Sequence, residues 1–405
     1  MNIGIFTESY TPYVNGVTVS VTTFAESLRR RGHTVHIFTP FMPGYEDNDP
    51  FVHRYPSVRF NWLWLQYEPD YVMAIGRAPG LQYILRWFFR AEVFKLRERG
   101  VLDRYIEDLP LDLIHTQSPF AMGAEGRRWA NRKRIPHIST FHTLYTEYTH
   151  YTPFIPRPIS LRFILNWTRK QYNTASVVIA PTESARDVLR SWGVHRPISI
   201  LATGIHIGDF QGGDRAGTRE KLEIPADALA LLYAGRMAPE KNIPLLLDAF
   251  RTVRAKRPDA VLVFAGGGPD MELTRKVVAE GGYADCVRFP GYIPHEKMRD
   301  YYAAADVMTC PSHTETQGLA LCEAMAAGLP FISVESPGAL SVVPQGYLDY
   351  LIPADADTMA DRVLSLAGDP AERARLADLG RETAHLFSAE TAGEKLLEIY
   401  GSVVS

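Results

Sequence analysis

Residues 306–334 read DVMTCPSHTETQGLALCEAMAAGLPFISV and contain a complete strand–helix–strand pattern. Apolar runs at 306–310 and 330–334 predict two buried strands, and the segment between them predicts a helix from about Thr316 to Gly328. A helix between two short apolar strands is typical of a βαβ unit, in which the strands are parallel. The polar loop after the first strand then lies at the carboxyl edge of the sheet, where open α/β folds bind their ligands.

The same alternation continues on both sides of this unit. Further strands are predicted at 2–7, 34–39, 112–116, 137–141, 176–180, 198–201, 230–234, 260–265 and 287–290. A glycine-rich stretch over 202–217 is typical of a linker. We therefore predict an α/β protein with two doubly wound, Rossmann-like domains that face each other across a cleft. The predicted domains are 1–203 and 204–385, and a last helix over 386–405 is expected to pack back on the first.

The composition is that of a folded protein, because 46% of the 405 residues are hydrophobic and 22% are charged. Disordered and collagen-like classes are thereby excluded. No apolar run reaches the 18 residues of a membrane-spanning helix, and the amino terminus lacks the pattern of a cleavable signal. The three cysteines, Cys286, Cys310 and Cys322, form no CxxC pair. A reducing cytoplasm is therefore expected, and structural zinc is disfavoured.

Charge is divided unevenly along the chain. The first 200 residues carry 24 basic and 17 acidic side chains, whereas the rest carry 19 basic and 29 acidic ones. A basic half favours an anionic partner, either a membrane surface or nucleic acid, although chance partition of surface charge gives the same pattern. Since no nucleic-acid-binding motif accompanies the basic half, nucleic acid is disfavoured as a partner.

Two carboxylates flank the helix of the opening stretch. Glu315 precedes it, close to backbone N–H groups that favour an anion, and Glu323 lies eight residues further on, about 12 Å along the axis. Each carboxylate can accept hydrogen bonds from the hydroxyls of one sugar, and a diphosphate suits the helix end between them. That is the layout of a nucleotide-sugar. The competing interpretation is that Glu315 caps the helix and Glu323 is merely solvated.

A second cluster follows the strand predicted at 230–234, where the sequence reads YAGRMAPEKN. Arg236 and Lys241 flank a turn at the end of this strand, and two cations there suit a pyrophosphate. Asn242 is predicted to cap the following helix. The competing interpretation is an ordinary surface ion pair with Glu240.

Two weaker signals follow the next strands. The loop FAGGGPD contains Gly267, and a glycine-rich loop after a strand lets a nucleotide approach the backbone. Its spacing is not G-x-G-x-x-G, so a dinucleotide dehydrogenase is disfavoured. Tyr292 and Ile293, after the strand at 287–290, can offer backbone groups to a base.

In the first half, His142 follows the strand predicted at 137–141, which places it at the cleft. It can hydrogen-bond a sugar hydroxyl or help to stabilise charge, although a single histidine is more often structural. Gly16 follows the loop after the first strand and lets the backbone approach phosphates. No metal site is predicted, because the spacing of the nearby residues matches no familiar one: His137, His142, Glu147 and His150.

Together these segments resemble the family 4 retaining glycosyltransferases of the GT-B fold. The matching motifs are the Glu-x7-Glu element from Glu315 to Glu323, the Gly-Arg-x4-Lys element from Gly235 to Lys241, and the glycine loop at 266–268. They occur in the order of the family, and the resemblance covers nearly the whole chain. The segment after Pro330, SPGALSVVPQGY at 336–347, departs from the usual pattern of the family.

The resemblance implies roles for these residues. Arg236 and Lys241 would bind the diphosphate, and Glu323 the ribose hydroxyls. Glu315 would lie against the donor hexose and His142 near the reacting centre, so these two are the catalytic candidates. Further donor contacts would come from Gly16, Gly267, Tyr292, Ile293, Thr316, Gln317, Gly318 and Leu319. The family requires no metal or other cofactor besides the nucleotide-sugar donor, consistent with positive charge supplied by Arg and Lys.

Within the family, TESYTPYVNGV at 7–17 and FHTLYTEY at 141–148 are similar to bacterial enzymes that transfer glucose from UDP-glucose to diacylglycerol. Tyr145 in the second motif is then an acceptor candidate. One alternative is a GDP-mannose-dependent mannosyltransferase acting on a phospholipid or glycolipid. An alternative of another class is a non-catalytic nucleotide-sugar-binding protein.

A membrane-facing surface is predicted for the first domain. Residues 77–104 carry seven basic and three acidic side chains, interleaved with aromatic ones. The candidate contacts with an anionic membrane are Trp62, Trp64, Arg86, Trp87 and Arg90. Together with the lipid acceptor, this predicts a cytoplasmic protein that is peripheral on the inner face of the cell membrane. The competing interpretation is an amphipathic core helix with one wet face.

Overall fold

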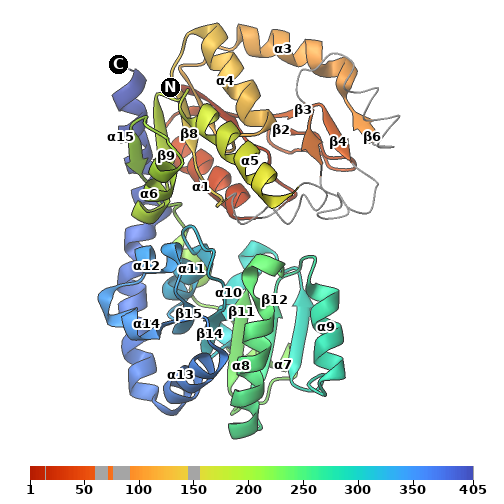
Figure 1. Cartoon of the computed structure of the whole chain (residues 1–405), viewed down its shortest axis with the longest axis vertical. Coiled ribbons are helices and arrows are strands. Elements are labelled where there is room, and N and C mark those ends of the chain that lie inside the picture. The colour runs from red at the N-terminus through yellow and green to blue at the C-terminus, as the bar shows by residue number, and fades with distance from the viewer. Residues whose placement is uncertain (14, 60–71, 76–91, 145–155, 405) are drawn as a thin grey trace. The chain divides into compact units, whose positions relative to one another are not determined.

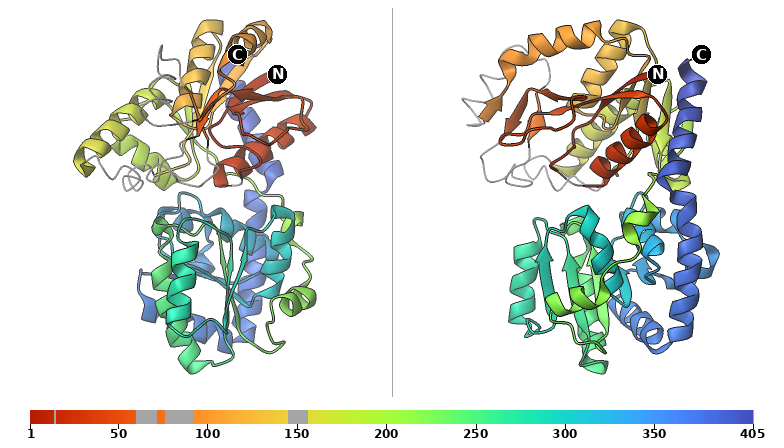
Figure 2. Two further views of the ribbon diagram at one scale, coloured as in Figure 1. Left: turned by 90° about the vertical axis from the view of Figure 1, so that its right-hand side faces the viewer. Right: turned by 180° about the vertical axis from the view of Figure 1, so that it is seen from behind.

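The computed structural model describes residues 1–13, 15–59, 72–75, 92–144 and 156–404. Contacts divide the chain into two compact units, one formed by Met1–Thr203 with Ala392–Ser405 and the other by Gly204–Thr391. Each unit is built around a parallel sheet with helices packed on both faces (Figures 1 and 2). The predicted class, α/β with two Rossmann-like domains, is confirmed.

The first unit contains a seven-stranded sheet in the order β10-β9-β8-β7-β1-β2-β3, with every neighbouring pair parallel. Its strands are β1 Asn2–Phe6, β2 Thr34–Pro40, β3 Val52–Tyr55, β7 Leu113–Thr116, β8 His137–Thr140, β9 Val177–Ala180 and β10 Ile198–Ile200. Its helices are α1 Gly16–Arg30, α3 Arg99–Asp108, α4 Ala121–Lys133, α5 Arg157–Tyr172, α6 Glu183–Ser191 and most of α15 Ala389–Val404.

The central strands of this sheet are buried because helices cover both faces. On one face, Ile3 and Ile5 of β1 pack with Phe24 and Leu28 of α1 and with Leu396 of α15. On the other face, residues of β1, β2 and α4 form a second buried cluster that includes Phe6, Phe38 and Trp129. α15 therefore forms part of the core of the first unit.

The second unit contains a six-stranded parallel sheet in the order β13-β12-β11-β14-β15-β16. Its strands are β11 Ala230–Ala234, β12 Val261–Ala265, β13 Val287–Gly291, β14 Val307–Cys310, β15 Phe331–Val334 and β16 Leu351–Ile352. Its helices are α7 Arg215–Lys221, α8 Ile243–Lys256, α9 Met271–Glu280, α10 Met298–Ala304, α11 Leu319–Ala327, α12 Pro337–Val342, α13 Ala356–Gly368 and α14 Pro370–Ala384, and several 3-10 turns join them.

The strands predicted from the sequence are all present, with shifts of at most one residue at their ends. Two local predictions are wrong. The helix expected from Thr316 begins at Leu319, because Gly318 adopts a left-handed φ of 80° and ends the loop there. Asn242 also adopts a left-handed φ, of 54°, and its side chain makes no capping hydrogen bond. A small antiparallel sheet, β5-β4-β6 (Met73–Ala74, Ser57–Arg59 and Glu92–Phe94), was not anticipated.

Candidate functional site

The candidate donor site lies at the carboxyl ends of β12, β11 and β14, which are neighbours in the second sheet. From β11 the chain continues to β12 on one side, whereas its neighbour on the other side is β14. Such a point, where the strand order reverses, leaves a crevice in which open α/β sheets bind ligands. The loops after these three strands carry Arg236 and Lys241, the glycine loop, and Glu315.

An ion pair joins two of these loops. The Lys241 ammonium Nζ donates to Glu315 Oε1 at 2.6 Å, and both side chains are mostly buried. Burial disfavours an ionised Glu315, but the adjacent Lys241 charge and its hydrogen bond outweigh this effect and lower the pKa of Glu315. Glu315 is therefore an anion at neutral pH, in contact with the cation predicted to bind a diphosphate.

The Arg236–Glu240 ion pair raised by the competing interpretation is present, since Arg236 donates to Glu240 Oε1. It is not a weak surface pair, because the Glu240 side chain is only 3% exposed. A buried carboxylate fixes the position of its guanidinium partner much more firmly than an exposed one. The pair thus orients Arg236 at the end of β11, and the Thr314 hydroxyl, which donates to the Glu240 carbonyl at 3.2 Å, ties this turn to the Glu315 loop.

The glycine loop packs directly against the Arg236 loop. The backbone N–H of Met237 donates to the Gly267 carbonyl at 2.8 Å, and that of Gly235 donates to the Ala265 carbonyl at 3.1 Å. A Cβ atom on Gly266 would lie 2.0 Å from the Gly235 carbonyl oxygen, whereas one on Gly267 would meet no atom within 4 Å. Gly266 is therefore required for packing, and Gly267 presents open backbone.

The second carboxylate of the motif, Glu323, belongs to α11 and is held by a tyrosine of α10. The Tyr302 hydroxyl donates to Glu323 Oε2 at 2.6 Å, and His295 Nε2 lies 4.0 Å from Oε1. Burial raises the pKa of Glu323, while the Tyr302 hydrogen bond opposes that rise. The interpretation of Glu323 as a merely solvated residue is wrong. Its partners were missed because Tyr302 and His295 come from a different helix and turn.

The other predicted donor residues surround this cluster. Thr316, Gln317 and Gly318 form the loop into α11, with Gln317 buried and Leu319 as the first helical residue. The unusual segment after β15 supports that loop, because the Gly338 N–H donates to the Glu315 carbonyl at 2.8 Å. Tyr292 follows β13 and is exposed, whereas Ile293 packs against the core.

In the first unit, His142 follows β8 and contacts a residue from the neighbouring strand. His142 Nε2 lies 2.7 Å from Gln117 Oε1, just after β7. Burial lowers the pKa of His142 to about 4, so its imidazole is neutral at pH 7. Gly16 begins α1, whose N-terminus is capped by Asn15 through bonds to Val17 and Thr18 at 3.0 Å. Both residues thus lie at the carboxyl edge of the first sheet.

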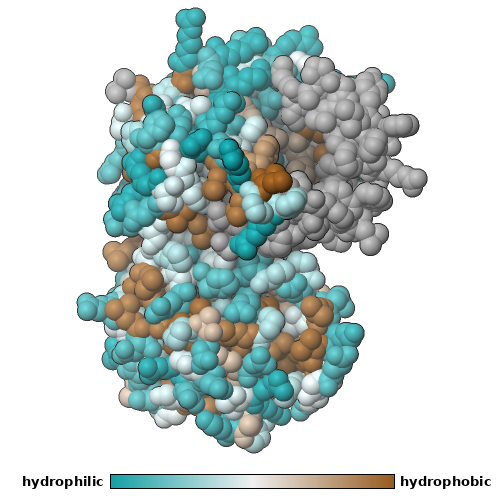
Figure 3. All heavy atoms as spheres, viewed as in Figure 1, coloured by the Kyte–Doolittle hydropathy of each residue, from teal (hydrophilic) through white to brown (hydrophobic). Residues whose placement is uncertain are grey.

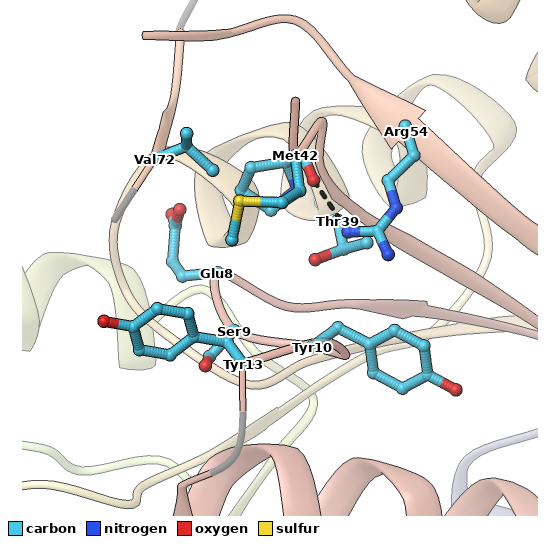
Figure 4. Close-up of a pocket in the computed structure, with 9 residues that line it drawn as sticks. Glu8, Ser9, Tyr10, Tyr13, Thr39, Met42, Arg54 and Val72 are labelled. Carbon is cyan, nitrogen blue, oxygen red and sulfur yellow. Dashed lines mark hydrogen bonds between the residues drawn. The ribbon is translucent and has the colours of Figure 1, made fainter. Parts of the chain in front are cut away.

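A small hollow at this edge was not singled out from the sequence. Glu8, Tyr10, Tyr13, Met42 and Arg54 line it together with Ser9, Thr39, Pro40 and Val72. Figure 4 shows the side chains of Glu8, Met42 and Val72 pointing toward one another. The Met122 N–H donates to Glu8 Oε1 at 2.6 Å, yet burial dominates and raises the pKa of Glu8 to about 7.

The remaining predicted contacts fall outside the described residues: Trp62, Trp64, Arg86, Trp87, Arg90 and Tyr145. Within the described ranges, no three His, Cys, Asp or Glu side chains gather as a metal site would require. In the same part of the chain, no helix combines the length and apolar character needed to cross a membrane.

Comparisons with known proteins match both units. A family model described as Glycosyltransferase Family 4 matches residues 14–208, and one described as Glycosyl transferases group 1 matches residues 214–383. The alpha-monoglucosyldiacylglycerol synthase of Acholeplasma laidlawii is 30% identical over 82% of this chain and 80% of its own length. The enzyme of that name from Streptococcus pneumoniae is 29% identical over 99% of this chain and 85% of its own.

A GDP-mannose-dependent alpha-mannosyltransferase of Corynebacterium glutamicum is also similar, with 26% identity over 85% of this chain and 75% of its own length. Among solved structures, a sucrose-phosphate synthase from Thermosynechococcus elongatus aligns with a TM-score of 0.75, 24% identity and coverage of 99% and 98% of the two chains. Anabaena HepE in complex with UDP-glucose aligns with a TM-score of 0.74, 18% identity and coverage of 99% and 100%. These two structures share the fold.

Proposed function

The chain belongs to glycosyltransferase family 4, and from that premise we propose that it transfers glucose from UDP-glucose to a lipid acceptor such as diacylglycerol. In this proposal the second unit binds the nucleotide-sugar and the first unit binds the acceptor. The transfer retains the anomeric configuration of the sugar. The protein works at an anionic membrane surface, the inner face of the cell membrane.

The observation that carries this proposal is the charge cluster at the carboxyl ends of β11 and β14. As the sugar–phosphate bond breaks, negative charge develops on the diphosphate, and preorganised cations stabilise it. Arg236, fixed by Glu240, and Lys241, 2.6 Å from Glu315, supply two such cations. In this proposal Glu315 contacts the sugar that is joined to that diphosphate.

The rest of the donor has matching partners in the second unit. Glu323 accepts from Tyr302 through one oxygen, and its other oxygen is suited to accept from ribose hydroxyls. Backbone at Gly267 admits the nucleotide, with Tyr292 and Ile293 beside its base and residues 316–319 beside the diphosphate. Gly16 and neutral His142 face the donor from the first unit, where His142 contacts the sugar.

Support for a membrane surface comes from α5 in the first unit. Its sixteen residues include Arg157, Arg162, Arg169 and Lys170 and no acidic side chain. Ile159 and Phe163 on the same helix are 61% and 67% exposed. Over the region that α5 occupies in Figure 1, Figure 3 shows hydrophobic atoms next to hydrophilic ones. A helix with apolar and cationic side chains exposed together suits the surface of an anionic bilayer, where each cation contributes about 1 kcal/mol.

α5 also lies near the candidate acceptor edge of the sheet. The indole Nε1 of Trp167 donates to the Pro119 carbonyl at 2.7 Å, and Pro119 follows Gln117 in the loop after β7. A bilayer in contact with α5 would therefore present its lipid headgroups close to His142. This is the edge at which a lipid hydroxyl has to arrive.

Glucose from a UDP donor is favoured by the relatives named alpha-monoglucosyldiacylglycerol synthase. A second candidate is mannose from GDP-mannose, which the printed name of the Corynebacterium glutamicum relative favours. The two candidates use the same charge cluster. They differ only in the base and the hexose that the second unit accepts.

The proposal is tested by offering UDP-glucose, UDP-galactose and GDP-mannose separately, with phosphatidylglycerol vesicles that contain or lack diacylglycerol. We expect glucosyl transfer that requires both UDP-glucose and diacylglycerol. Transfer only from GDP-mannose would favour the second candidate, and binding of UDP-glucose without transfer to any lipid would favour a non-catalytic role.

The membrane surface is tested with the double substitution Ile159→Ser and Phe163→Ser. We expect weaker flotation with anionic vesicles and slower transfer to diacylglycerol, with unchanged affinity for UDP. Val101→Ser is the matched control, since Val101 on α3 is also 61% exposed in the same unit. Equal flotation of the wild type, the double variant and Val101→Ser would contradict the proposal that α5 contacts the membrane.

A further inference from the structure

A chain of buried polar groups runs from His142 to the C-terminal helix of the first unit. Gln117 Oε1 lies 2.7 Å from His142 Nε2, and Gln117 Nε2 lies 3.2 Å from His115 Nε2. His115 Nδ1 lies 2.7 Å from the hydroxyl of Tyr400, on α15. His115, Gln117 and Tyr400 are almost fully buried. The chain thus links three segments that are 285 residues apart at their extremes.

Hydrogen-bonding chemistry fixes the direction of every bond in this series once the orientation of the Gln117 amide is known. A neutral imidazole has one N–H and one lone pair, and an amide has one oxygen that accepts and one nitrogen that donates. Burial lowers the pKa of His115 to about 3 and that of His142 to about 4, so both rings are neutral. Reversing the Gln117 amide therefore reverses all of them.

With the Gln117 amide as it stands, His142 Nε2 carries the proton and donates to Gln117. The Gln117 amide donates to His115 Nε2, and the Thr140 hydroxyl oxygen lies 2.6 Å from the same nitrogen. The remaining proton of His115 is then on Nδ1, from which it is donated to the Tyr400 oxygen. His142 consequently carries its lone pair on Nδ1.

We propose that Tyr400, acting through His115 and Gln117, is a positioning residue that fixes the tautomer and orientation of His142. This inference rests on the proposed function, in which neutral His142 contacts the donor sugar. A histidine whose ring nitrogens exchanged roles would present the wrong group to a sugar hydroxyl or to developing charge. A phenylalanine side chain in place of Tyr400 can neither donate nor accept a hydrogen bond, so His115 Nδ1 would lose its partner on α15.

The structure offers a matched control in the same unit. Tyr172 is also fully buried, and its hydroxyl donates to the backbone carbonyl of Thr140 at 3.4 Å. Tyr172→Phe and Tyr400→Phe therefore remove the same atom from equally buried tyrosines. The second removes the hydroxyl that lies 2.7 Å from His115 Nδ1.

The experiment compares the histidine tautomers by ¹⁵N NMR in protein labelled at histidine, with the His142 signals assigned from a His142→Asn variant. We expect one tautomer at His142 in the wild type and Tyr172→Phe, and a mixture of tautomers in Tyr400→Phe. In the same variant we expect kcat for glucosyl transfer to fall about tenfold. Loss of one hydrogen bond can change the ratio of the two tautomers by about that factor, and only one of them is expected to be active. KM for UDP-glucose should change little.

Gln117→Met provides a second route that leaves α15 untouched. We expect it to produce the same mixture at His142, and adding Tyr400→Phe to it should have no further effect. Additive effects, or an unchanged tautomer and kcat in Tyr400→Phe, would overturn the inference. If the wild type transfers no glucose, the proposed function fails, but the NMR comparison still decides whether Tyr400 controls His142.

Discussion

At the scale of single residues, Lys241 is the cation whose removal changes the candidate donor site most directly. It lies 2.6 Å from Glu315 and holds the pKa of that carboxyl below its ordinary value. We expect Lys241→Met to weaken UDP binding by about 10- to 100-fold, since hydrogen bonds to charged groups contribute about 1.5–3 kcal/mol. Calorimetric titration with UDP measures this loss.

The control for that prediction is Lys256→Met. Lys256 is an exposed lysine of α8 that pairs only loosely with Asp361, at 3.3 Å. Exposed pairs of this kind contribute little, so UDP affinity should be unchanged. Similar losses in the two variants would mean that Lys241 acts through the overall charge of the second unit rather than by contact.

The Tyr302–Glu323 bond gives a prediction about pH. Burial raises the pKa of Glu323, and the Tyr302 bond, which stabilises the carboxylate, opposes that rise. Tyr302→Phe should therefore raise the pKa of Glu323 further. If ribose hydroxyls need an ionised acceptor, UDP binding weakens as pH falls, and this weakening should begin at a higher pH in the variant.

The dissociation constant of UDP between pH 5 and 8 measures this shift. His295 faces the other Glu323 oxygen at 4.0 Å, so His295→Gln is introduced into both proteins as a control. Identical pH profiles with and without the Tyr302→Phe substitution would contradict a role of the hydroxyl in holding Glu323 ionised.

The sequence alone identifies the charged residues of the candidate donor site but not the groups that hold them. Arg236, Lys241, Glu315 and Glu323 stand at recognisable spacings after predicted strands. Tyr302 is 21 residues from Glu323 and belongs to another helix, so only the tertiary fold brings the two together. Gln117 could have been identified from the sequence as a residue at the carboxyl edge of the first sheet, since it directly follows the strand predicted at 112–116, but no motif marks it.

At the scale of elements, the geometry of the glycine loop after β12 predicts which of its glycines is required for packing. Gly266→Ala should destabilise the second unit by about 2 kcal/mol or more, because a Cβ would lie 2.0 Å from the Gly235 carbonyl and φ is 149°. Gly267→Ala should leave stability unchanged, since a Cβ there meets nothing within 4 Å. Thermal unfolding monitors both. A larger loss at Gly267 would contradict this assignment.

The start of α11 shows where element prediction from sequence fails. The residues 316–318 are compatible with a first helical turn, and the pattern placed the helix start at Thr316. Gly318 instead adopts a left-handed φ of 80°, so the helix cannot include residues 316–318 and begins at Leu319, and Gln317 is buried in the loop before it. A glycine at a helix start gives no local sign of which conformation it adopts, because it populates both readily.

At the scale of the whole molecule, the hydrophobic pattern predicted both parallel sheets because their central strands are buried on both faces and most of them contain a short apolar run. The elements that escaped prediction are short or lie at edges. β16 has two residues, Leu351–Ile352, and the antiparallel β5-β4-β6 sheet has strands of two or three. Strands of this length contain too few residues for a period to be recognised.

The return of the chain to the first unit gives a prediction about its stability. Ala392, Leu396 and Tyr400 form one stripe of α15, all buried among residues of α1 and the first sheet. Leu396→Ala should destabilise the first unit by about 2–5 kcal/mol, the usual effect of a cavity in a packed core. Leu386→Ala, at a side chain that is 68% exposed, should change stability by less than about 0.5 kcal/mol. Backbone hydrogen exchange shows which unit loses stability in Leu396→Ala. We expect faster exchange in β1 and β7 of the first unit. Faster exchange confined to the strands of the second unit would contradict the prediction that α15 stabilises the first unit.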